Sequence, residues 1–412
     1  LLILFTALKL TGVYAYFRPP SPARRHPVPH HPHLPLISVL VPLYQEAEIS
    51  QALLRRLQRL TYPKSKREVF LVLEEGDTIT QNAVTRARLP EWIHVIEVPE
   101  WGDLRTKPRA MNFALNFCRG AIIGVWDAED APQSDQLEKV AAAFATADTK
   151  TACFQGVLDF YNPHANWISR CFTLEYASWF RIVLPGIARL RLVVPLGGTT
   201  MFIRRRVLEE LKGWDAHNVT EDADLGVRLC RAGYRTDMLP SVTYEEANCT
   251  PIAWMRQRSR WLKGFMLTYL VHMRHPALLM QQLGPARFFG FQAFFLGTLS
   301  QFLLAPFLWS FWLVLFGLPH PSAPILSEIG VSLAAAALVF FELLGIFIAV
   351  VAAFAAGRPA LALWAPCLSF YFAMGAVAIY KALHELMTDP FYWDKTTHGH
   401  YEPEPDLEQN PR

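Results

Sequence analysis

Charged residues are scarce in this chain of 412 residues, because Asp, Glu, Lys and Arg together make up only 18%. Hydrophobic residues reach 52% and the mean hydropathy is +0.17, which is unusual for a soluble protein. The scarcity is uneven: most charges lie between Arg18 and Arg274, whereas residues 288–380 carry almost none. This split argues against a purely soluble protein and predicts a soluble domain followed by a membrane domain.

Cysteine is also sparse, with six residues, no CxxC pair and no Cys/His spacing that suits zinc. Scattered cysteines of this kind are typical of a reducing compartment, so we expect free thiols and a cytoplasmic catalytic part. Four histidines, His26, His30, His31 and His33, are interleaved with prolines. They are interpreted as part of an extended linker, with a metal-binding tract as the alternative.

Composition shifts divide the chain into six expected segments. The first is interpreted as a shortened membrane helix with its C-terminal end in the cytoplasm, because Arg18, Arg24 and Arg25 follow it. We therefore expect a multi-pass protein of the inner (cytoplasmic) membrane with a cytoplasmic catalytic domain. The segments are a membrane helix (1–17), a linker (18–35), a catalytic α/β domain (36–250), interfacial amphipathic helices (251–285), a membrane domain of about three apolar helices (286–386) and a tail (387–412).

The side on which the tail lies stays open. Apolar stretches cover residues 288–317, 331–356 and 361–383, and the second contains one carboxylate, Glu342. Three spans after a cytoplasmic domain would place the tail outside, although the basic residues that follow the last span suit the inside. One of the three stretches could then be re-entrant.

Between Leu36 and Thr250, short β-branched runs alternate with helical stretches. LISVLVP, EVFLVLE, IHVIEVP and AIIGVWD each predict a buried strand, and KPRAMNFALNFC predicts one of the helices between them. The alternation predicts a mostly parallel sheet covered on both faces. Ligands bind at the C-terminal ends of such strands, and acidic residues gather at those ends: Glu46, Glu74, Glu75, Asp77, Asp127, Glu129 and Asp130.

Two acidic motifs suit catalysis. In WDAEDAP, Asp127 could bind a divalent metal with Glu129 or Asp130 beside it, and the alternative is an acidic turn that caps the next helix. In VTEDADLG, Asp222 is a candidate general base on the first turn of a predicted helix. Ordinary helix-start chemistry is the alternative there, with Thr220 as the N-cap and Asp224 serving the same purpose.

The motif QRSRW places three functional side chains on one face of a predicted helix. Gln257, Arg260 and Trp261 are spaced i, i+3 and i+4. A ring, an amide and a guanidinium suit a sugar plane, its hydroxyls and a diphosphate. The alternative is a basic amphipathic helix on anionic lipid. Both can hold if the flanking basic residues point elsewhere and meet lipid: Arg256, Arg258 and Lys263.

The ordered set VPLYQEAE, LEEGD, KPRAMN, DAED, GGTT, TEDADLG and QRSRW resembles the membrane-bound family 2 glycosyltransferases. These include bacterial cellulose synthase, hyaluronan synthase and chitin synthase. The resemblance covers residues 36–275, and seven motifs in order are far more specific than any one of them. It implies an α/β GT-A fold (Rossmann-like, mostly parallel), inversion at the anomeric carbon, a nucleotide-sugar donor with UDP-sugars favoured, and Mg²⁺ or Mn²⁺.

The resemblance also implies a role for each matching residue. Asp222, with Glu221 beside it, would be catalytic. The donor nucleotide would be bound by Pro42, Glu46, Glu74, Glu75, Lys107 and Asp127. The metal-facing acids would be Asp127, Glu129 and Asp130. The acceptor and the diphosphate would be bound by Gln257, Arg260, Trp261, Gly198 and Thr199.

The chain departs from the family pattern at two places. The usual Asp-x-Asp is replaced by Asp127, Ala128 and Glu129, which leaves Asp130 as an alternative second acid. Glu74 and Glu75 stand where aspartates are usual, which weakens the assignment of the base carried by the donor. The segment FYWDKTTHG in the tail is similar to aromatic-basic segments that approach the active site in some relatives, with a membrane-edge anchor as the alternative.

Three functions are compatible with these features. The leading expectation is a processive synthase that builds and exports a β-linked polysaccharide. The second is a single-addition glycosyltransferase that makes a glycolipid, and the third is a non-catalytic envelope scaffold. The expected partners are the nucleotide-sugar donor, a glycan or glycolipid acceptor, membrane lipids and accessory envelope subunits, with no nucleic acid.

Overall fold

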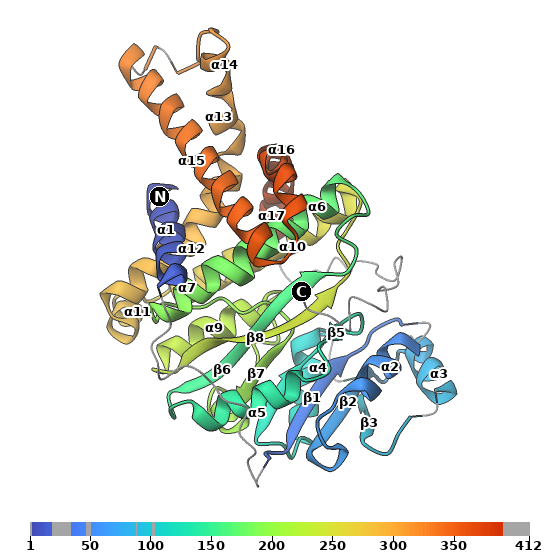
Figure 1. The fold of residues 1–412 in the computed structure, drawn as a ribbon. Helices are drawn as coiled ribbons and strands as arrows, with labels where there is room; N and C mark the ends of the chain where they lie inside the picture. Colours follow the sequence, from blue (N-terminus) through green and yellow to red (C-terminus); the bar gives the residue numbers. More distant parts are fainter. Residues whose placement is uncertain are drawn as a thin grey trace.

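The computed structural model describes residues 2–18, 34–46, 51–87, 89–100, 104–322, 324–325 and 327–389. An α/β domain carries a group of apolar helices that project from one side of it (Figure 1). Most of the expected linker and the whole FYWDKTTHG segment lie outside the described residues.

The secondary structure alternates between strands and helices as far as α5 and becomes mostly helical after β8. The strands are β1 (Ile37–Pro42), β2 (Arg67–Glu74), β3 (Ile93–Val98), β4 (Ile122–Val125), β5 (Ala131–Pro132), β6 (Thr151–Phe160), β7 (Met201–Arg204) and β8 (Arg235–Glu245). The helices of the α/β domain are α2 (Gln51–Arg59), the 3₁₀ turn η2 (Lys64–Lys66), α3 (Thr78–Arg86), α4 (Lys107–Leu115), α5 (Gln136–Thr146), α6 (Trp167–Tyr176), the π-helix η3 (Ala177–Val183), α7 (Leu184–Arg189), α8 (Arg205–Glu210) and α9 (Glu221–Arg231). The remaining helices are α1 (Leu2–Phe17), α10 (Pro251–His272), α11 (Pro276–Leu283), α12 (Pro285–Leu303), α13 (Ala305–Ser310), α14 (Trp312–Leu315), α15 (Glu328–Ala355), the 3₁₀ segment η4 (Pro359–Cys367), α16 (Leu368–Ala373) and α17 (Gly375–Thr388).

The strands form one eight-stranded sheet in the order β3-β2-β1-β4-β7-β6-β8-β5. Strands β1 to β4 pair in parallel, as do β6 and β8, whereas β7 runs antiparallel to both of its neighbours. The four strands predicted from β-branched runs are all present. The expectation of a mostly parallel sheet is therefore confirmed.

Helices cover both faces of the sheet because successive side chains of a buried strand point to opposite sides. In β1, Val39 and Val41 pack in a cluster with residues of α2, α3 and α5. Leu40, between them, packs in another cluster with residues of α4, α8 and α9. A strand buried on both faces explains why ISVLVP is apolar except for Ser38, whose hydroxyl donates a hydrogen bond to Glu68.

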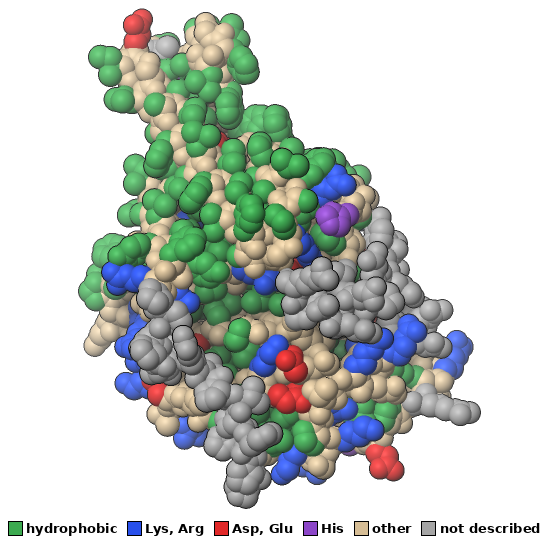
Figure 2. Space-filling view, viewed as in Figure 1, with side chains coloured by type: hydrophobic (Ala, Val, Ile, Leu, Met, Phe, Trp, Pro, Cys, Tyr) green, Lys and Arg blue, Asp and Glu red, His purple; other side chains and the backbone are tan. Residues whose placement is uncertain are grey.

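The C-terminal helices are apolar enough to enter a membrane. Two stretches qualify as spans by length and composition, Glu328–Ala355 and Pro359–Thr388. A third is formed if Pro285–Leu303 and Ala305–Leu315, which meet at a bend of 59°, count as one broken span. Figure 2 shows hydrophobic side chains over these helices, whereas charged side chains gather over the α/β domain.

Buried ion pairs attach the apolar helices to the sheet. Asp159 in β6 is 1% exposed and accepts hydrogen bonds from Arg181 in η3 and Arg358 before η4, both at 2.7 Å. Burial alone would raise the pKa of Asp159, but the two guanidinium groups hold it below its usual value. One arginine comes from η3 and the other from the residue before η4, so this carboxylate fixes the position of these two elements relative to each other.

Helix α1 lies beside α7 and α12 although they are far apart in the sequence (Figure 1). Two glycines allow the closest approach, because a Cβ at Gly186 would lie 1.9 Å from the carbonyl oxygen of Gly12. Arg189 donates hydrogen bonds to the carbonyl oxygens of Ala15 and Tyr16, at 2.7 and 2.6 Å. These bonds satisfy carbonyl groups that the end of a helix leaves without partners.

Replacement of Gly186 by alanine should therefore destabilise the protein. The added methyl group has no space against the backbone of α1, and overpacking of this kind typically costs about 1–3 kcal/mol. Thermal unfolding in detergent measures the effect. Gly345→Ala is the matched control, because a Cβ there meets no atom within 4 Å among the described residues. Equal melting temperatures for the two variants would contradict the close contact between α1 and α7.

Candidate active site

A cavity of about 1220 Å³ lies between the C-terminal ends of the strands, helix α10 and the apolar helices. Thirteen of the residues predicted from sequence line it: Pro42, Glu46, Glu74, Lys107, Asp127, Glu129, Gly198, Thr199, Glu221, Asp222, Gln257, Arg260 and Trp261. Glu75 and Asp130 do not line it. Segments that are far apart in the sequence thus meet at one site.

Lys107 lies at the centre of the acidic part of the cavity. It is the first residue of α4, and its ammonium group donates hydrogen bonds to the Asp127 carboxylate and, at 3.3 Å, to the carbonyl oxygen of Gly198. Burial would lower the pKa of Lys107, but Asp127, Glu221 and Asp222 raise it above its usual value. Lys107 is therefore a fixed positive charge among carboxylates.

Asp130 lies behind Asp127 and is 1% exposed. Its Oδ2 accepts hydrogen bonds from the backbone N–H of Asp127, at 2.8 Å, and from the hydroxyl of Thr199. Burial raises the pKa of Asp130 well above its usual value, and the nearby Asp127 and Glu129 raise it further. The geometry makes Asp130 a residue that positions Asp127 and Thr199 from behind the cavity wall.

The two glutamates after β2 have different surroundings. Glu74 faces the cavity and forms an ion pair with Arg109 at 2.9 Å, whereas Glu75 accepts a hydrogen bond from the backbone N–H of Glu100 at 3.1 Å. The loop after β1 is held nearby, because the backbone N–H of Glu46 donates to Thr80 at 2.9 Å. Glu74 and Glu46 therefore flank the end of the cavity next to β1 and β2.

Asp222 and Glu221 occupy the first turn of α9 and face the same cavity. A Cβ built on Gly198 would lie 3.5 Å from Oδ2 of Asp222, so a glycine leaves room beside this carboxylate. Burial raises the pKa of Asp222 to about 6, while the N–H of Ala223 and the charge of Lys107 limit the rise. Burial raises the pKa of Glu221 to about 8; the charge of Lys107 opposes this rise, and repulsion from Asp222 adds to it. A carboxylate with such a pKa is suited to accept a proton near neutral pH.

The helix-start interpretation of TEDADLG is wrong in two respects. Thr220 occupies the N-cap position of α9, but its side chain makes no capping hydrogen bond. Asp224 is buried and binds Arg228 at 2.6 Å and His272 of α10 at 2.9 Å. Burial would raise the pKa of Asp224, but these two partners hold it below its usual value. Asp224 thus joins α9 to α10 instead of capping α9.

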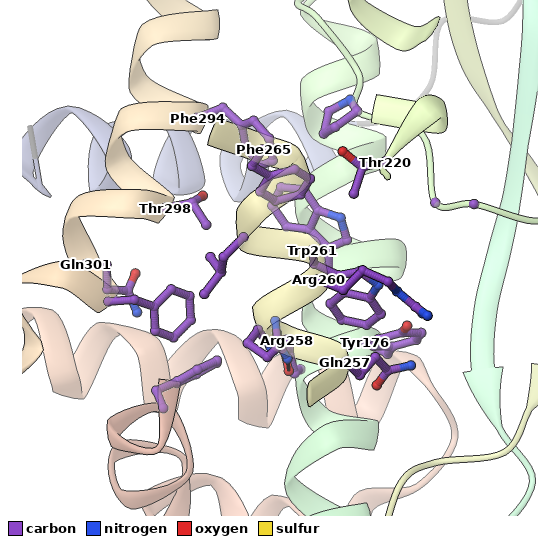
Figure 3. A pocket seen from close by; sticks show the side chains of 18 of the residues that line it. Tyr176, Thr220, Gln257, Arg258, Arg260, Trp261, Phe265, Phe294, Thr298 and Gln301 are labelled. Atoms are coloured by element: carbon purple, nitrogen blue, oxygen red, sulfur yellow. Dashed lines mark hydrogen bonds and ion pairs between the residues drawn. The ribbon is translucent and has the colours of Figure 1, made fainter. Parts of the chain in front are cut away.

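Helix α10 presents Gln257, Arg260 and Trp261 to the cavity (Figure 3). The amide oxygen of Gln257 accepts a hydrogen bond from Asn248 at 2.9 Å, which fixes the amide orientation. The ring of Trp261 lies 6.4 Å from that of Tyr176. The helix approaches α9 closely at Gly264, where a Cβ would lie 2.3 Å from the hydroxyl oxygen of Thr220.

The expectation that the basic residues flanking Gln257, Arg260 and Trp261 meet lipid is wrong for two of them. Arg258 is 8% exposed and forms a bidentate ion pair with Glu175, at 2.7 and 2.5 Å. Lys263 is 1% exposed and pairs with Glu385 of α17 at 3.1 Å. Arg256 alone of the three is exposed. The helix is packed against α9, α12 and α17, so its basic residues are drawn inward by buried carboxylates.

Several residues in the cavity wall escaped the sequence analysis. Glu245 is the last residue of β8 and Glu246 follows it, and the rule that found Asp127 at the end of β4 would have found them had β8 been predicted. Burial, together with Asp130 and Asp127, raises the pKa of Glu245 well above its usual value. Tyr176 carries no motif signal, and Arg258, although it belongs to QRSRW, was assigned to lipid instead of the cavity wall. Residues from the apolar helices also line the cavity, among them Lys9, Thr298 and Glu342.

The acidic part of the cavity suits a divalent cation shared with a ligand. Within the described residues, no group of three or more His, Cys, Asp and Glu side chains forms a ready-made metal cage. Mg²⁺ is commonly bound by one or two carboxylates together with phosphate oxygens and water. Asp127 and Glu129 provide two such carboxylates. One oxygen each of Asp130 and Glu245 is buried without a hydrogen-bond partner among the described residues, and burial together with repulsion between the neighbouring carboxylates raises the pKa of both groups, so a cation would relieve that repulsion.

Comparison with known proteins agrees with this geometry. A family model described as "Glycosyltransferase like family 2" matches residues 32–264. The probable glycosyltransferase YdaM of Bacillus subtilis (strain 168) is 27% identical over 233 residues, which is 56% of this chain and 55% of YdaM. The beta-monoglucosyldiacylglycerol synthase of Trichormus variabilis is 30% identical over 246 residues, which is 58% of this chain and 50% of that protein. The chain thus spans about half the length of these curated relatives.

A solved structure has the same fold over nearly its whole length. The mannosyltransferase PcManGT from Pyrobaculum calidifontis, in complex with GDP-Man and Mn²⁺, superposes with a TM-score of 0.56 at 20% identity. The match covers 92% of this chain and 97% of that one. The expected GT-A fold is therefore confirmed.

The role of Asp224 can be tested by Asp224→Asn. An asparagine is as good as an aspartate at a helix start, so a capping role predicts almost no change in stability. Removal of the buried carboxylate charge from Arg228, and from its hydrogen bond with His272, should instead cost about 3–5 kcal/mol. Thermal or denaturant unfolding of the purified protein measures the difference, with Asp215→Asn on the exposed preceding loop as the control. A loss no larger than that of the control would exclude the ion-pair role.

Proposed function

The chain belongs to glycosyltransferase-like family 2, and from that membership we propose that it transfers a single sugar from a nucleotide-sugar to a lipid acceptor. The observation that carries the proposal is one continuous cavity. Its lining runs from Lys107 and Asp127 at the sheet, past Trp261, to residues of α12, α13 and α15. A donor held at the sheet and an acceptor held among apolar helices would therefore meet in the same space.

The acceptor half of the cavity favours a lipid over a growing glycan. A glycan needs aromatic planes and hydrogen-bonding groups along its path, whereas acyl chains need apolar walls. Most residues that α12, α13 and α15 contribute are aliphatic, aromatic or alanine: Phe294, Phe302, Ala305, Phe307, Leu308, Trp309, Ala334, Ala337, Leu338, Phe341 and Ile346. This composition moves glycolipid synthesis ahead of the processive polysaccharide synthase that the sequence placed first. A relative named as a monoglucosyldiacylglycerol synthase points to the same class of acceptor.

On the donor side, the nucleotide would lie against Pro42, Glu46 and Glu74 at the ends of β1 and β2. Lys107 would compensate the charge of the diphosphate, and Gln257 and Arg260 of α10 would hold it from the other side. A divalent ion, Mg²⁺ or Mn²⁺, would be held by Asp127 and Glu129 and would neutralise the leaving diphosphate. Asp130 would keep Asp127 in position.

Asp222 would remove the proton from the acceptor hydroxyl. Its carboxylate faces the cavity beside Gly198, a residue with no side chain to block the approach of the acceptor. The hydroxyl oxygen would attack the anomeric carbon from the face opposite the diphosphate, so the configuration would invert. Trp261 and Tyr176 would provide the apolar surface against which the acceptor lies.

The apolar helices, which are long and apolar enough to cross a membrane, support a location of this reaction at a membrane. The proposed arrangement is a multi-pass protein of the inner membrane with the α/β domain on the cytoplasmic side, where nucleotide-sugars are made. Helices α12 and α13 of the bent pair line the cavity, and α14 continues the pair to the end of the apolar helices that lies away from the α/β domain (Figure 1). This arrangement suits a path by which a lipid enters from the bilayer. The proposal is the same whether the tail (387–412) lies on the cytoplasmic or the outer side of the membrane.

The direct test is nucleotide release by the purified protein in detergent. UDP-, GDP- and dTDP-sugars are offered with Mg²⁺ or Mn²⁺, with and without dioleoylglycerol, and the products are separated by size and by lipid solubility. Release that depends on dioleoylglycerol, with a single sugar on the lipid, is the expected result. A high-mass product formed without added lipid would instead establish the polysaccharide synthase.

Asp222→Asn should abolish transfer while the protein still binds the donor nucleotide. An amide cannot accept the proton, and loss of a general base typically lowers the rate by about 10²–10⁴-fold. The turnover rate and the nucleotide dissociation constant are measured separately, because a base acts only at the chemical step. Loss of nucleotide binding in this variant would show that Asp222 has a structural role instead.

The rate should also depend on pH in a direction set by Asp222. Because its pKa is raised to about 6, the side chain is protonated and inactive below that pH and becomes a competent base above it. The ratio kcat/KM should therefore rise as pH increases through about 6, and this ratio reports groups of the free enzyme. A profile that is flat between about pH 5 and about pH 8 would exclude Asp222 as the base.

A further inference from the structure

The apolar half of the cavity contains half-buried charged groups that the reaction scheme leaves without a role. Lys9 of α1, Glu175 of α6 and Glu342 of α15 all line it, together with Thr298 of α12. Ionisable side chains within membrane-spanning segments are costly and usually mark a functional site. Glu342 lies in a candidate membrane span, and Lys9 and Glu175 add two further charges to the same cavity from α1 and α6, so this group needs an explanation beyond packing.

The charged groups form a connected line that starts at the acceptor site. The guanidinium of Arg258 lies 4.9 Å from the ring of Trp261 and is bound by both oxygens of Glu175. Lys9, Glu175 and Glu342 line the same cavity, and both carboxylates are near enough to Lys9 for their charges to act on it. The line thus leads from the acceptor-facing tryptophan into the apolar helices.

Two hydroxyl groups extend this line. Ser369 of α16 donates a hydrogen bond to Glu342, which holds that carboxylate at the wall of the cavity. The hydroxyl oxygen of Thr298 is buried without a hydrogen-bond partner among the described residues. Figure 3 shows Thr298 and Gln301 of α12 on the opposite side of the cavity from Arg258 and Trp261 of α10. A molecule between these two helices would meet polar groups from both.

The charges of this group balance. Lys9 and Arg258 are cations, and Glu175 and Glu342 are carboxylates, so the group has no surplus of either sign. A phosphate-bearing lipid would need surplus positive charge and several donors. An uncharged headgroup with hydroxyl and ester oxygens needs donors and acceptors together, and an ammonium, a hydroxyl and a carboxylate supply both.

We propose that Lys9, Thr298 and Glu342 form a subsite that binds the uncharged, oxygen-rich headgroup region of the acceptor lipid and selects it over anionic lipids. Lys9 and Thr298 donate hydrogen bonds to oxygens of the lipid, and Glu342 accepts one from a hydroxyl. The lipid is thereby held with a reacting hydroxyl directed toward Trp261 and Asp222. The inference rests on the proposed transfer to a lipid.

The alternative is a purely structural ion cluster that ties α1, α6 and α15 together. The two roles predict different losses. A structural cluster affects stability and every kinetic constant, whereas a lipid subsite affects the constants for the lipid and leaves donor affinity unchanged. For each variant, the change in KM for the lipid is therefore compared with the change in affinity for the donor nucleotide.

The experiment uses the full chain in dodecylmaltoside micelles with Lys9→Met and Glu342→Gln. The KM for dioleoylglycerol should rise about tenfold or more in each variant, since a hydrogen bond to a charged group is worth about 1.5–3 kcal/mol. Nucleotide affinity should stay the same. Leu343→Ala is the matched control, because this neighbour of Glu342 is 60% exposed and does not line the cavity. If the first pair does not fold, Lys9→Arg and Glu342→Asp replace it.

A binding measurement separates this proposal from the proposed function. Fluorescent diacylglycerol and fluorescent phosphatidate are titrated into the wild-type protein and both variants without any donor. Tighter binding of the diacylglycerol, weakened in both variants, supports the subsite even if the wild-type enzyme makes polymer and the transfer proposal fails. Equal binding by wild type and variants, or tighter binding of phosphatidate, overturns the subsite.

Discussion

Lys107 lies between two sets of buried carboxylates, and the arrangement of the active site depends on that charge. Asp127 is its direct partner, and Glu221 and Asp222 act on it from α9. Carboxylates that lose water repel one another and tend to take up protons, which is why burial raises the pKa of Asp222 and Glu221. A cation fixed at the start of α4 allows both groups to face one cavity. It leaves Asp222 with a pKa low enough to work as a base.

Helix α10 extends this constraint from the sheet to the membrane. Gly264 lets it approach Thr220 next to the base, while Arg258 and Lys263 bind carboxylates of α6 and α17. One rigid helix therefore positions Trp261 relative to both the reacting groups and the apolar helices. A buried ion pair is weak evidence for stability, but it specifies which way each face of a helix points. That specification determines that Gln257, Arg260 and Trp261 face the cavity.

The sequence predicted those parts of the fold that depend on local pattern. Continuous β-branched runs predicted β1 to β4, and their acidic ends marked Asp127, because both signals lie within a few residues. Arg258 and Lys263 were misassigned because spacing along one helix does not reveal their carboxylate partners on α6 and α17, and the role of Asp224 was missed because His272 lies on α10. Glu245 was missed for a related reason: β8 pairs with β6, across 75 or more residues of chain. Long-range pairs of this kind have no local signature.

The composition of the cavity wall constrains the acceptor more tightly than any motif does. QRSRW occurs beside the donor site and is compatible with either a polymer or a lipid, because both present a hydroxyl to the base. Beyond Trp261 the wall is mostly apolar, with polar side chains of α12 such as Thr298 and Gln301 and a charge-balanced group that includes Lys9 and Glu342. A growing glycan would gain little from alanine and leucine and would lose hydration there. A lipid with an uncharged oxygen-rich headgroup matches both the polar group and the apolar wall, so one molecule accounts for two features that a glycan would leave unexplained.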